Sequence, residues 1–431
     1  MRRTFWARRG AFRRRAWWVV LLPVWVAVAA VAAPAAEGLP EWPRFRGPNG
    51  EGVAEADSIP TQWTPADYRW RVKLPGEGHS SPVVHGDRLF VTAGLPESGA
   101  RVIRCLRVAD GGLIWKQEFA SSVHKMHAFN NYAVATPALD GRNVYLTWAD
   151  PEHYVVVALD QQKGRELWRQ DLGPFAAEHG FGASPAVFEN LLIVPNDQDG
   201  PSGVVALDCA TGGVVWRTPR AGGRAAYSTP CLLGGDGPPQ LLMSSTASGL
   251  TSLDPRTGRV LWQLADVFDQ RVVGSPMVAA GLVFAACGTG GSGTRLIAVR
   301  PGDAEGKRPP EIAYNVKGSL PYVCTPVAHG PLVFLWYDQG VVTCLEAASG
   351  EVVWRERVGG KYFGSPVRVG DRLYCMSREG EMVVLAAERQ YRLLARIDLG
   401  EPTHATPAVA DGVMYLRTLT HLMALGGKNA P

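Results

Sequence analysis

Two histidines and two asparagines occur close together in one polar stretch of the chain. His124-Lys-Met-His127 is followed by Asn130, Asn131 and Tyr132. Neutral imidazoles are common zinc ligands, and the H-x-x-H spacing can place two of them on one ion. No third ligand is identifiable from the sequence, so we predict no metal site. We interpret the segment as a loop anchored by hydrogen bonds of its His and Asn side chains.

Two further segments have residues that bind ions in other proteins. Asn196-Asp-Gln-Asp-Gly200 has oxygen ligands at alternate positions, as calcium loops do, but lacks the downstream Glu of an EF-hand. Gly288-Thr-Gly-Gly-Ser-Gly293 can cradle a phosphate only if it opens a helix, and no helical pattern follows. We therefore expect both segments to be hairpins between strands.

The elements that position these residues are repeated along the chain. A Ser-Pro or Thr-Pro followed by alternating apolar residues occurs eight times, at separations from 40 residues (Pro326 to Pro366) to 55 residues (Pro82 to Pro137). A period of this length is typical of β-propeller blades. The prolines are Pro82, Pro137, Pro185, Pro230, Pro276, Pro326, Pro366 and Pro407.

Most repeats also carry a turn followed by a tryptophan strand, although the motif decays in the fifth and seventh copies. In Leu207-Asp208 to Trp216, the Asp carboxylate can accept backbone N–H groups of the turn, and Gly212 can adopt a positive φ without steric cost. The indoles are expected to wedge between neighbouring blades, where each buries ~150–250 Å². The residues assigned to this docking are Trp70, Trp115, Trp168, Trp216, Trp262, Trp354, Asp110, Asp160, Asp208 and Asp254.

The eighth repeat stops at Met423-Ala-Leu425 without a fourth strand, whereas Tyr68 to Leu74 carries a Trp before the first repeat. Pairing of these two ends would close the ring and remove the exposed sheet edges. We predict an all-β fold: an eight-bladed β-propeller of four-stranded antiparallel blades with tryptophan-docking turns, the last blade closed by the N-terminal strand. It spans residues 67–426.

The loops before each Ser/Thr-Pro should surround one mouth of the central channel. A ring of aromatic, His and Arg side chains there suits a small polar molecule, a sugar or a peptide segment. Alternatively, these side chains plug the channel and satisfy one another. The candidate ligand-binding residues are His79, His127, Asn131, Tyr132, His179, Phe181, Tyr227, Arg271, Tyr322, Lys361, Tyr362 and His404, and no catalytic residue is assigned.

The N-terminus has the composition of an export signal. Residues 1–36 contain seven Arg and no acidic residue, and Ala16 to Ala33 is uncharged and apolar. We predict a signal peptide, with an uncleaved membrane anchor as the alternative. Removing these residues leaves 37 basic and 40 acidic side chains, a net charge of −3, which argues against nucleic acid as a partner. Residues 37–66 are interpreted as an extended lead-in on the surface.

Seven cysteines are scattered through strand-like runs, without C-x-x-C or adjacent pairs. We expect buried free thiols that pack as small hydrophobic groups rather than a disulfide framework.

The A-x-D-x-x-T-G-x-x-x-W turn and the S-P-x-V strands resemble the PQQ-like (pyrroloquinoline quinone) β-propeller repeat. Quinoprotein dehydrogenases and the outer-membrane assembly lipoprotein BamB share this repeat. The lead-in Trp42-Pro-Arg-Phe-Arg-Gly-Pro-Asn-Gly50 resembles that of exported PQQ-like proteins. The resemblance covers roughly residues 42–425, and it implies a bacterial envelope protein.

Two functions remain open at this point. The first is a non-catalytic binding or scaffolding propeller of the periplasm or envelope, monomeric, whose partner is an envelope protein or a small polar ligand. The second is a PQQ-dependent dehydrogenase of alcohols or sugars. The resemblance implies that such enzymes hold the quinone between a Trp and a disulfide of adjacent cysteines, with calcium bound by Asp, Glu and Asn. This chain has no adjacent cysteines, so we expect neither PQQ nor calcium.

Overall fold

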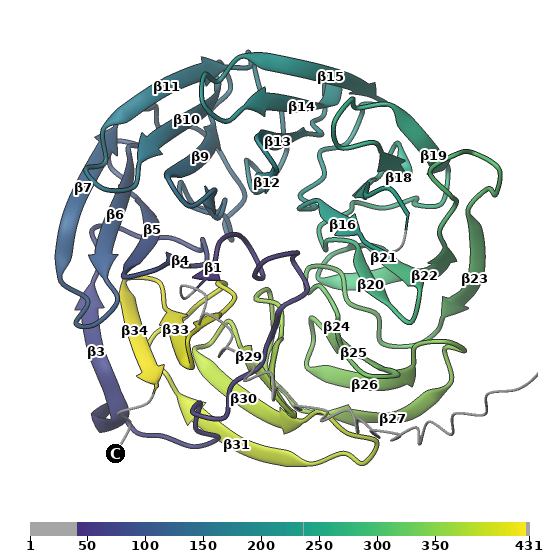
Figure 1. The fold of residues 1–431 in the computed structure, drawn as a ribbon. Helices are drawn as coiled ribbons and strands as arrows, with labels where there is room; N and C mark the ends of the chain where they lie inside the picture. Colours follow the sequence, from purple (N-terminus) through teal and green to yellow (C-terminus); the bar gives the residue numbers. More distant parts are fainter. Residues whose placement is uncertain (1–40, 236, 428–431) are drawn as a thin grey trace, which may run out of the picture. The chain divides into compact units, whose positions relative to one another are not determined.

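A computed structural model describes residues 41–235 and 237–427, and these residues form eight sheets arranged in a ring (Figure 1). The expected signal peptide lies outside the described residues. Each sheet is one blade, and in the first seven blades the four blade strands run in chain order from the centre of the ring to its rim (Figure 1). The predicted all-β, eight-bladed propeller is confirmed.

In every blade, four antiparallel strands follow one another from the centre to the rim. Blade 1 consists of β4 (Val83–His85), β5 (Arg88–Gly94), β6 (Arg101–Arg107) and β7 (Leu113–Phe119). Blade 2 consists of β8 (Ala138–Leu139), β9 (Asn143–Ala149), β10 (Tyr154–Asp160) and β11 (Glu166–Asp171). Blade 3 consists of β12 (Ala186–Phe188), β13 (Leu191–Asn196), β14 (Ser202–Asp208) and β15 (Val214–Arg220). Blade 4 consists of β16 (Cys231–Leu233), β17 (Gln240–Ser245), β18 (Gly249–Leu253) and β19 (Val260–Leu264).

Blade 5 consists of β20 (Met277–Ala279), β21 (Leu282–Thr289), β22 (Ser292–Arg300) and β23 (Glu311–Val316). Blade 6 consists of β24 (Val327–His329), β25 (Leu332–Tyr337), β26 (Val341–Glu346) and β27 (Val352–Arg357). Blade 7 consists of β28 (Val367–Val369), β29 (Arg372–Met376), β30 (Glu381–Ala386) and β31 (Leu393–Asp398). Blade 8 consists of β32 (Ala408–Ala410), β33 (Val413–Arg417), β34 (His421–Gly426) and β3 (Tyr68–Lys73).

The described residues otherwise contain β1 (Glu41–Trp42), β2 (Val53–Ala54) and one short 3₁₀ helix, η1 (Pro65–Asp67). No helix in this part of the chain is long and apolar enough to cross a bilayer.

The middle strands of the blades are buried on both faces. In β25, for example, the five residues from Leu332 to Trp336 are all buried. A blade lies between two neighbours and has no solvent-facing side at its centre, so these strands are continuous apolar runs rather than alternating ones. All seven cysteines are free and buried.

The tryptophan turns dock most blades onto the next, although the Trp262 indole donates to Gln240 of its own blade and β31 of blade 7 contains no Trp. The indole Nε1 of Trp168 in blade 2 donates a hydrogen bond of 3.0 Å to the carbonyl of Cys209 in blade 3. A Cβ on Gly212 would lie 2.5 Å from the Trp168 ring, so the turn needs glycine for space as well as for its φ of +71°. Asp208 accepts the backbone N–H of Thr211 at 2.9 Å, as the sequence predicts.

Pairing of the two ends of the propeller closes the ring. Strand β3 runs antiparallel to β34, with Trp70 opposite Ala424. The indole of Trp70 then donates to the carbonyl of Val108 in blade 1 at 2.8 Å. Blade 8 is therefore completed by the N-terminal strand, as predicted.

The hydroxyl groups of the Ser/Thr-Pro pairs form a second connection between the blades. The residue before the proline donates its backbone N–H to the corresponding hydroxyl of the following blade, at 2.9–3.3 Å. Seven such bonds are present: Ser81 to Thr136, Thr136 to Ser184, Thr229 to Ser275, Ser275 to Thr325, Thr325 to Ser365, Ser365 to Thr406 and Thr406 to Ser81. The recurring hydroxyl thus holds the innermost strands together.

The lead-in differs from the expected surface segment. Trp42 and Arg46 are only 1% exposed. Strand β1 adds to β4 of blade 1, and β2 adds in parallel to β28 of blade 7, so both blades have five strands. The guanidinium of Arg46 donates to the carbonyls of Pro366 at 2.7 Å and Pro326 at 2.8 Å.

Similar contacts extend across the ring, where Arg44 donates to the carbonyl of Pro230, and Asn49 exchanges two hydrogen bonds with the backbone of Leu232. The first strands of blades 4, 6 and 7 leave these carbonyls unpaired, and the lead-in satisfies them. Residues 41–66 pack across one end of the channel, so part of the segment expected on the surface is buried (Figure 1).

Candidate functional site

A cavity of about 760 Å³ lies on the channel axis. Its wall has two sources. One is the set of loops that lead into the innermost strands, which we call the inner loops; the other is the set of hairpins between the second and third strands, which we call the second hairpins. Phe45 of the lead-in also lines it, from the side of the proline carbonyls. A cavity of this size matches the usual range for small-molecule sites.

Nine of the twelve candidate residues line this cavity. They come from the inner loops of blades 1 to 8: His79, His127, His179, Phe181, Tyr227, Arg271, Tyr322, Lys361 and His404. The propeller brings them together although they span most of the chain. Whether they bind a ligand remains a prediction.

The other three candidates lie elsewhere. Tyr362 is fully buried, and its ring packs against Trp336 at a centroid distance of 5.4 Å within the core of blades 6 and 7. Lys361 and Phe363 face the cavity, whereas Tyr362 between them faces the core. The placement of Tyr362 at the channel mouth is therefore wrong.

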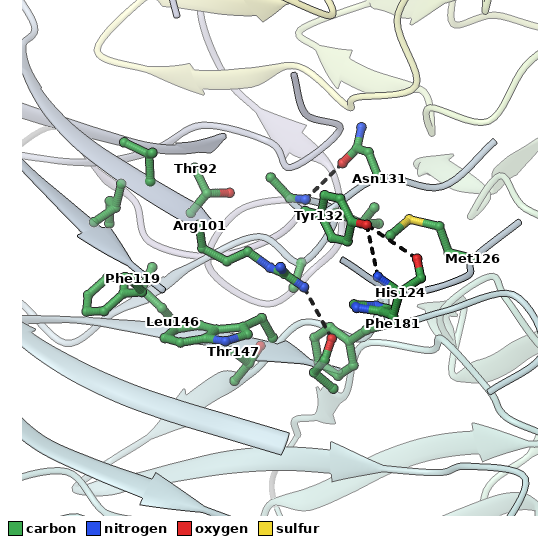
Figure 2. A pocket seen from close by; sticks show the side chains of 17 residues that line it. Thr92, Arg101, Phe119, His124, Met126, Asn131, Tyr132, Leu146, Thr147 and Phe181 are labelled. Atoms are coloured by element: carbon green, nitrogen blue, oxygen red, sulfur yellow. Dashed lines mark hydrogen bonds between the residues drawn. The ribbon is translucent and has the colours of Figure 1, made fainter. Parts of the chain in front are cut away.

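Asn131 and Tyr132 line a separate, water-sized cavity of about 30 Å³ (Figure 2). The guanidinium of Arg101 lies 4.6 Å from the centroid of the Tyr132 ring, and the Tyr132 hydroxyl hydrogen-bonds the backbone of His124. Asn131 accepts the backbone N–H of Ala133 at 2.9 Å. These side chains hold the inner loop in place and face away from the channel, which corrects their assignment to the mouth.

The inner loop of blade 2, residues 120–136, crosses the mouth of the channel. On one side, His127 stacks on His179 at 4.6 Å, and the Asn130 side chain donates to the carbonyls of His179 and Phe181. On the other side, Phe129 contacts Phe363 at a centroid distance of 5.7 Å. Phe363 precedes blade 7, so the loop joins opposite sides of the ring.

The cavity wall is rich in cations. Arg224, Arg271, Lys361 and Arg378 line it, against the two carboxylates of Glu178 and Asp338. Arg271 pairs with Glu178 at 2.6 Å. This hydrogen bond lowers the pKa of Glu178, which therefore stays ionised.

Arg378 contacts two aromatic rings. Its guanidinium carbon lies 3.9 Å from the ring centroid of Phe129 and 4.5 Å from that of Phe363, and both are cation–π contacts. The two centroids are 5.7 Å apart, so the rings lie on adjacent sides of the guanidinium carbon. Within the described residues, its buried Nε has no hydrogen-bond partner.

Two histidines of the cavity are neutral at pH 7. His79 and His404 stack at 4.1 Å. Burial, followed by the charge of Arg378, lowers the pKa of His404 to about 4. Burial and the neighbouring His404 likewise lower the pKa of His79 well below its ordinary value.

Asp338 is the buried carboxylate of the wall. It accepts the backbone N–H groups of Tyr322 at 2.6 Å and Val323 at 2.8 Å. Burial raises its pKa to about 7, although these two hydrogen bonds act in the opposite direction. Asp338 therefore orders the inner loop of blade 6 and carries only part of a negative charge at neutral pH.

The segments with ion-binding residue types have other partners. His124 contacts Tyr132, whereas His127 stacks on His179, so the two histidines do not converge. Asp197 forms an ion pair of 2.9 Å with Arg220, and both side chains are almost completely buried. In the described part of the chain, no three His, Cys, Asp or Glu side chains form a group that could hold a metal.

The wall does not match the quinone site that the family resemblance implies. Among residues 41–235 and 237–427, neither a Trp nor a Cys lines the cavity. The oxygen ligands of the Asn196–Gly200 segment are directed elsewhere, since Asp199 accepts the backbone N–H groups of Glu178 and Ala225. The side chains that line the cavity are mainly cationic and aromatic instead.

Several cavity residues are absent from the sequence-based list. Arg378, Asp338 and Gln339 belong to second hairpins, and Phe129 lies two residues after His127. The rule that second hairpins share a face with the inner loops would have selected the first three. Glu178, Arg224 and Phe45 carried no comparable signal.

Comparison with known proteins agrees with the repeat pattern. The model of the PQQ-repeat family described as outer membrane protein assembly factor BamB matches residues 65–154, 151–308, 316–393 and 338–429. BamB of Yersinia pestis is 23% identical over 316 residues, which cover 70% of this chain and 75% of that protein.

Two dehydrogenases are also similar. A polyvinylalcohol dehydrogenase of Pseudomonas sp is 29% identical over 189 residues, or 39% of this chain, and the match spans only 28% of that protein's length. The crystal structure of a quinohemoprotein alcohol dehydrogenase from Comamonas testosteroni superposes with a TM-score of 0.66 at 15% identity, covering 90% of this chain and 81% of that one. The structural likeness concerns the fold alone. Because the family model matches most of its length, this chain belongs to the PQQ-repeat propeller family described as outer membrane protein assembly factor BamB.

Proposed function

We propose that this chain is an exported, non-catalytic β-propeller of the bacterial cell envelope that binds a partner protein or a small polar ligand at its channel-mouth cavity. The observation that carries the proposal is the cavity itself. It is about 760 Å³ in volume, and its wall combines Arg, Lys, His and aromatic side chains from different blades. Such a mixture of apolar surface and few converging polar groups is typical of recognition sites.

The rigidity of the wall supports binding. Arg378 contacts two phenyl rings, Arg271 is fixed by Glu178, and Asp338 holds the backbone of its neighbouring loop. Side chains that are already ordered lose little conformational entropy when a ligand binds. The membership in the BamB family and the composition of residues 1–36 support the envelope location.

Affinity capture from envelope extract tests the proposal. The tagged wild-type chain is expected to retain a partner or a small molecule that the double variant Tyr227→Ala plus Arg271→Ala releases. Tyr227 and Arg271 both line the cavity, whereas Arg256 lies outside it and pairs with Glu189. Arg256→Gln therefore serves as the control and should bind like the wild type. Equal retention by wild type and double variant would count against a cavity site.

The similarity to polyvinylalcohol dehydrogenase favours a PQQ-dependent dehydrogenase as the second candidate. Addition of PQQ and calcium to purified protein separates the two functions. We expect neither a stable quinone absorbance nor dye reduction with alcohols or sugars, because the described wall lacks the Trp and adjacent cysteines of the family's enzymes. Both signals together would replace the binding proposal by the dehydrogenase.

A further inference from the structure

We propose that the channel-mouth cavity recognises an acidic sugar, whose carboxylate lies against the free edge of Arg378. This inference rests on the proposed binding function and assigns the class of its ligand. It follows from three features of the wall: an arginine that contacts two aromatic rings and has a free N–H edge, an excess of cations, and flat aromatic surfaces beside polar groups.

The free edge of Arg378 is the first feature. Phe129 and Phe363 contact the guanidinium from adjacent sides, with ring centroids 3.9 Å and 4.5 Å from its carbon. Among the described residues the side chain forms no ion pair, and its Nε is buried without a partner. The in-plane N–H groups along the edge of the guanidinium are the part of arginine that binds a carboxylate through two parallel hydrogen bonds. The aromatic contacts therefore hold Arg378 at the cavity wall, where its N–H groups are available to a carboxylate.

The charge of the wall is the second feature. Four cations face two carboxylates, and one of these carboxylates, Asp338, has a pKa raised to about 7 by burial. Only Arg271 forms an ion pair with a described carboxylate, Glu178, which is itself exposed at 69% of its side-chain surface. His79 and His404 are neutral and add no charge to this excess. The carboxylate of Glu379, next to Arg378 in the chain, offsets part of the excess. The remaining positive charge favours an anion over a neutral ligand.

The remaining wall is suited to a hydroxylated ring. The aromatic residues Tyr227 and Tyr322 provide flat surfaces, and Thr289 and Gln339 provide a hydroxyl group and an amide carbonyl beside them. The Tyr227 hydroxyl is buried and has no hydrogen-bond partner within the described chain. An apolar ring face packs on aromatic rings, while ring hydroxyls satisfy buried polar groups. A sugar carrying a carboxylate combines both properties.

Isothermal titration at pH 7.5 tests this assignment with digalacturonate, its neutral counterpart galactobiose, and citrate, an anion without a ring. We expect digalacturonate to bind at least about tenfold more tightly than the other two. We also expect its binding to weaken when salt is raised to about 0.15 M. Equal binding of galactobiose would overturn the role of charge, and equal binding of citrate would overturn the role of the sugar ring. Absence of digalacturonate binding would overturn the proposal.

Variants locate the site. Arg378→Gln is expected to weaken digalacturonate binding at least about tenfold, and Arg378→Lys to restore only part of it, because lysine keeps the charge but lacks the planar fork. Glu178→Gln removes a competing carboxylate from Arg271 at an exposed position and should strengthen binding. Arg256→Gln, outside the cavity, should leave it unchanged. Weaker or unchanged binding by Glu178→Gln would contradict the assignment even if Arg378→Gln failed to fold.

Failure of this inference is distinguishable from failure of the proposed function. If capture from envelope extract depends on Tyr227 and Arg271 while digalacturonate does not bind, the cavity is a binding site for another class of ligand. If neither experiment gives a cavity-dependent signal, both proposals are wrong.

Discussion

The stacked imidazoles of His79 and His404 show how burial sets the charge of single residues in the cavity. The two rings lie 4.1 Å apart with Arg378 close by. Transfer of a charge to such a site is unfavourable, so both histidines remain neutral. They serve as a flat polar surface at neutral pH rather than as a source of positive charge, which comes from the arginines.

This burial predicts a pH dependence of stability. The pKa of His404 is about 4 in the folded protein against an ordinary 6.5, so the unfolded chain binds a proton first as the pH falls. Stability is therefore lost between pH 6.5 and about 4, and His404→Gln should remove that part of the loss. Urea unfolding of both proteins at pH 7.5 and 5 measures the difference.

Asp338 acts in the opposite direction, because its pKa is raised to about 7. As the pH falls, the folded protein therefore binds this proton before the unfolded chain does, which stabilises the folded state. That contribution is common to the wild type and His404→Gln and cancels in their difference. The same pH dependence in both proteins would show that His404 does not contribute.

At the scale of elements, the tryptophan turn is the unit that makes neighbouring blades adhere. Its aspartate orders the backbone, its glycine leaves room for the indole of the preceding blade, and the indole donates to a carbonyl of the turn. In blade 5, Tyr314 replaces Trp and donates its hydroxyl to Ala347 of blade 6. The docking therefore depends on a large aromatic group with a donor at its tip, which both indole and phenol provide.

The space required by the indole can be separated from the backbone conformation. Gly212 and Gly281 have φ angles of +71° and +72°, but a Cβ would lie 2.5 Å from Trp168 at Gly212 and would meet nothing within 4 Å at Gly281. Gly281→Ala should cost about 1 kcal/mol from the left-handed conformation alone. Gly212→Ala should cost about 1–3 kcal/mol more, because the core is overpacked. Equal losses in chemical denaturation would show that the indole moves away without penalty.

At the scale of the whole molecule, two long-range devices hold the ring. Strand β3 completes blade 8, and the lead-in fastens the first strands of blades 4, 6 and 7 at one end of the channel. The lead-in also brings Phe45 into the cavity wall. Closure of the ring and the shape of the binding cavity are thus coupled through one short segment.

Arg46→Met tests the contribution of the lead-in. The substitution removes the donors to the carbonyls of Pro326 and Pro366 and leaves them buried without partners. The expected loss of unfolding free energy is about 3 kcal/mol, since an unsatisfied buried group loses its solvation without compensation. Arg169→Met, which breaks an exposed pair with Glu166, should change stability little. Similar urea midpoints for the two variants would mean that the lead-in does not fasten the ring.

The sequence alone determined the fold, because its determinants are local and repeated. The Ser/Thr-Pro pairs, the Asp and Gly of each turn and the Trp shortly after them act within one blade, and their repetition gives the number of blades. The truncated eighth repeat and the unpaired Trp70 strand also predicted closure, because sheet edges must be paired.

The tertiary structure decided which residues meet across the ring. Phe129 contacts Phe363 and Arg378, Arg46 binds Pro326 and Pro366, and Tyr362 turns into the core between two neighbours that face the cavity. None of these pairs shares a local pattern, since the partners are brought together only when eight separately formed blades close into a circle. Local side-chain chemistry therefore predicted the blades, whereas the composition of the cavity depends on contacts that the closed ring creates.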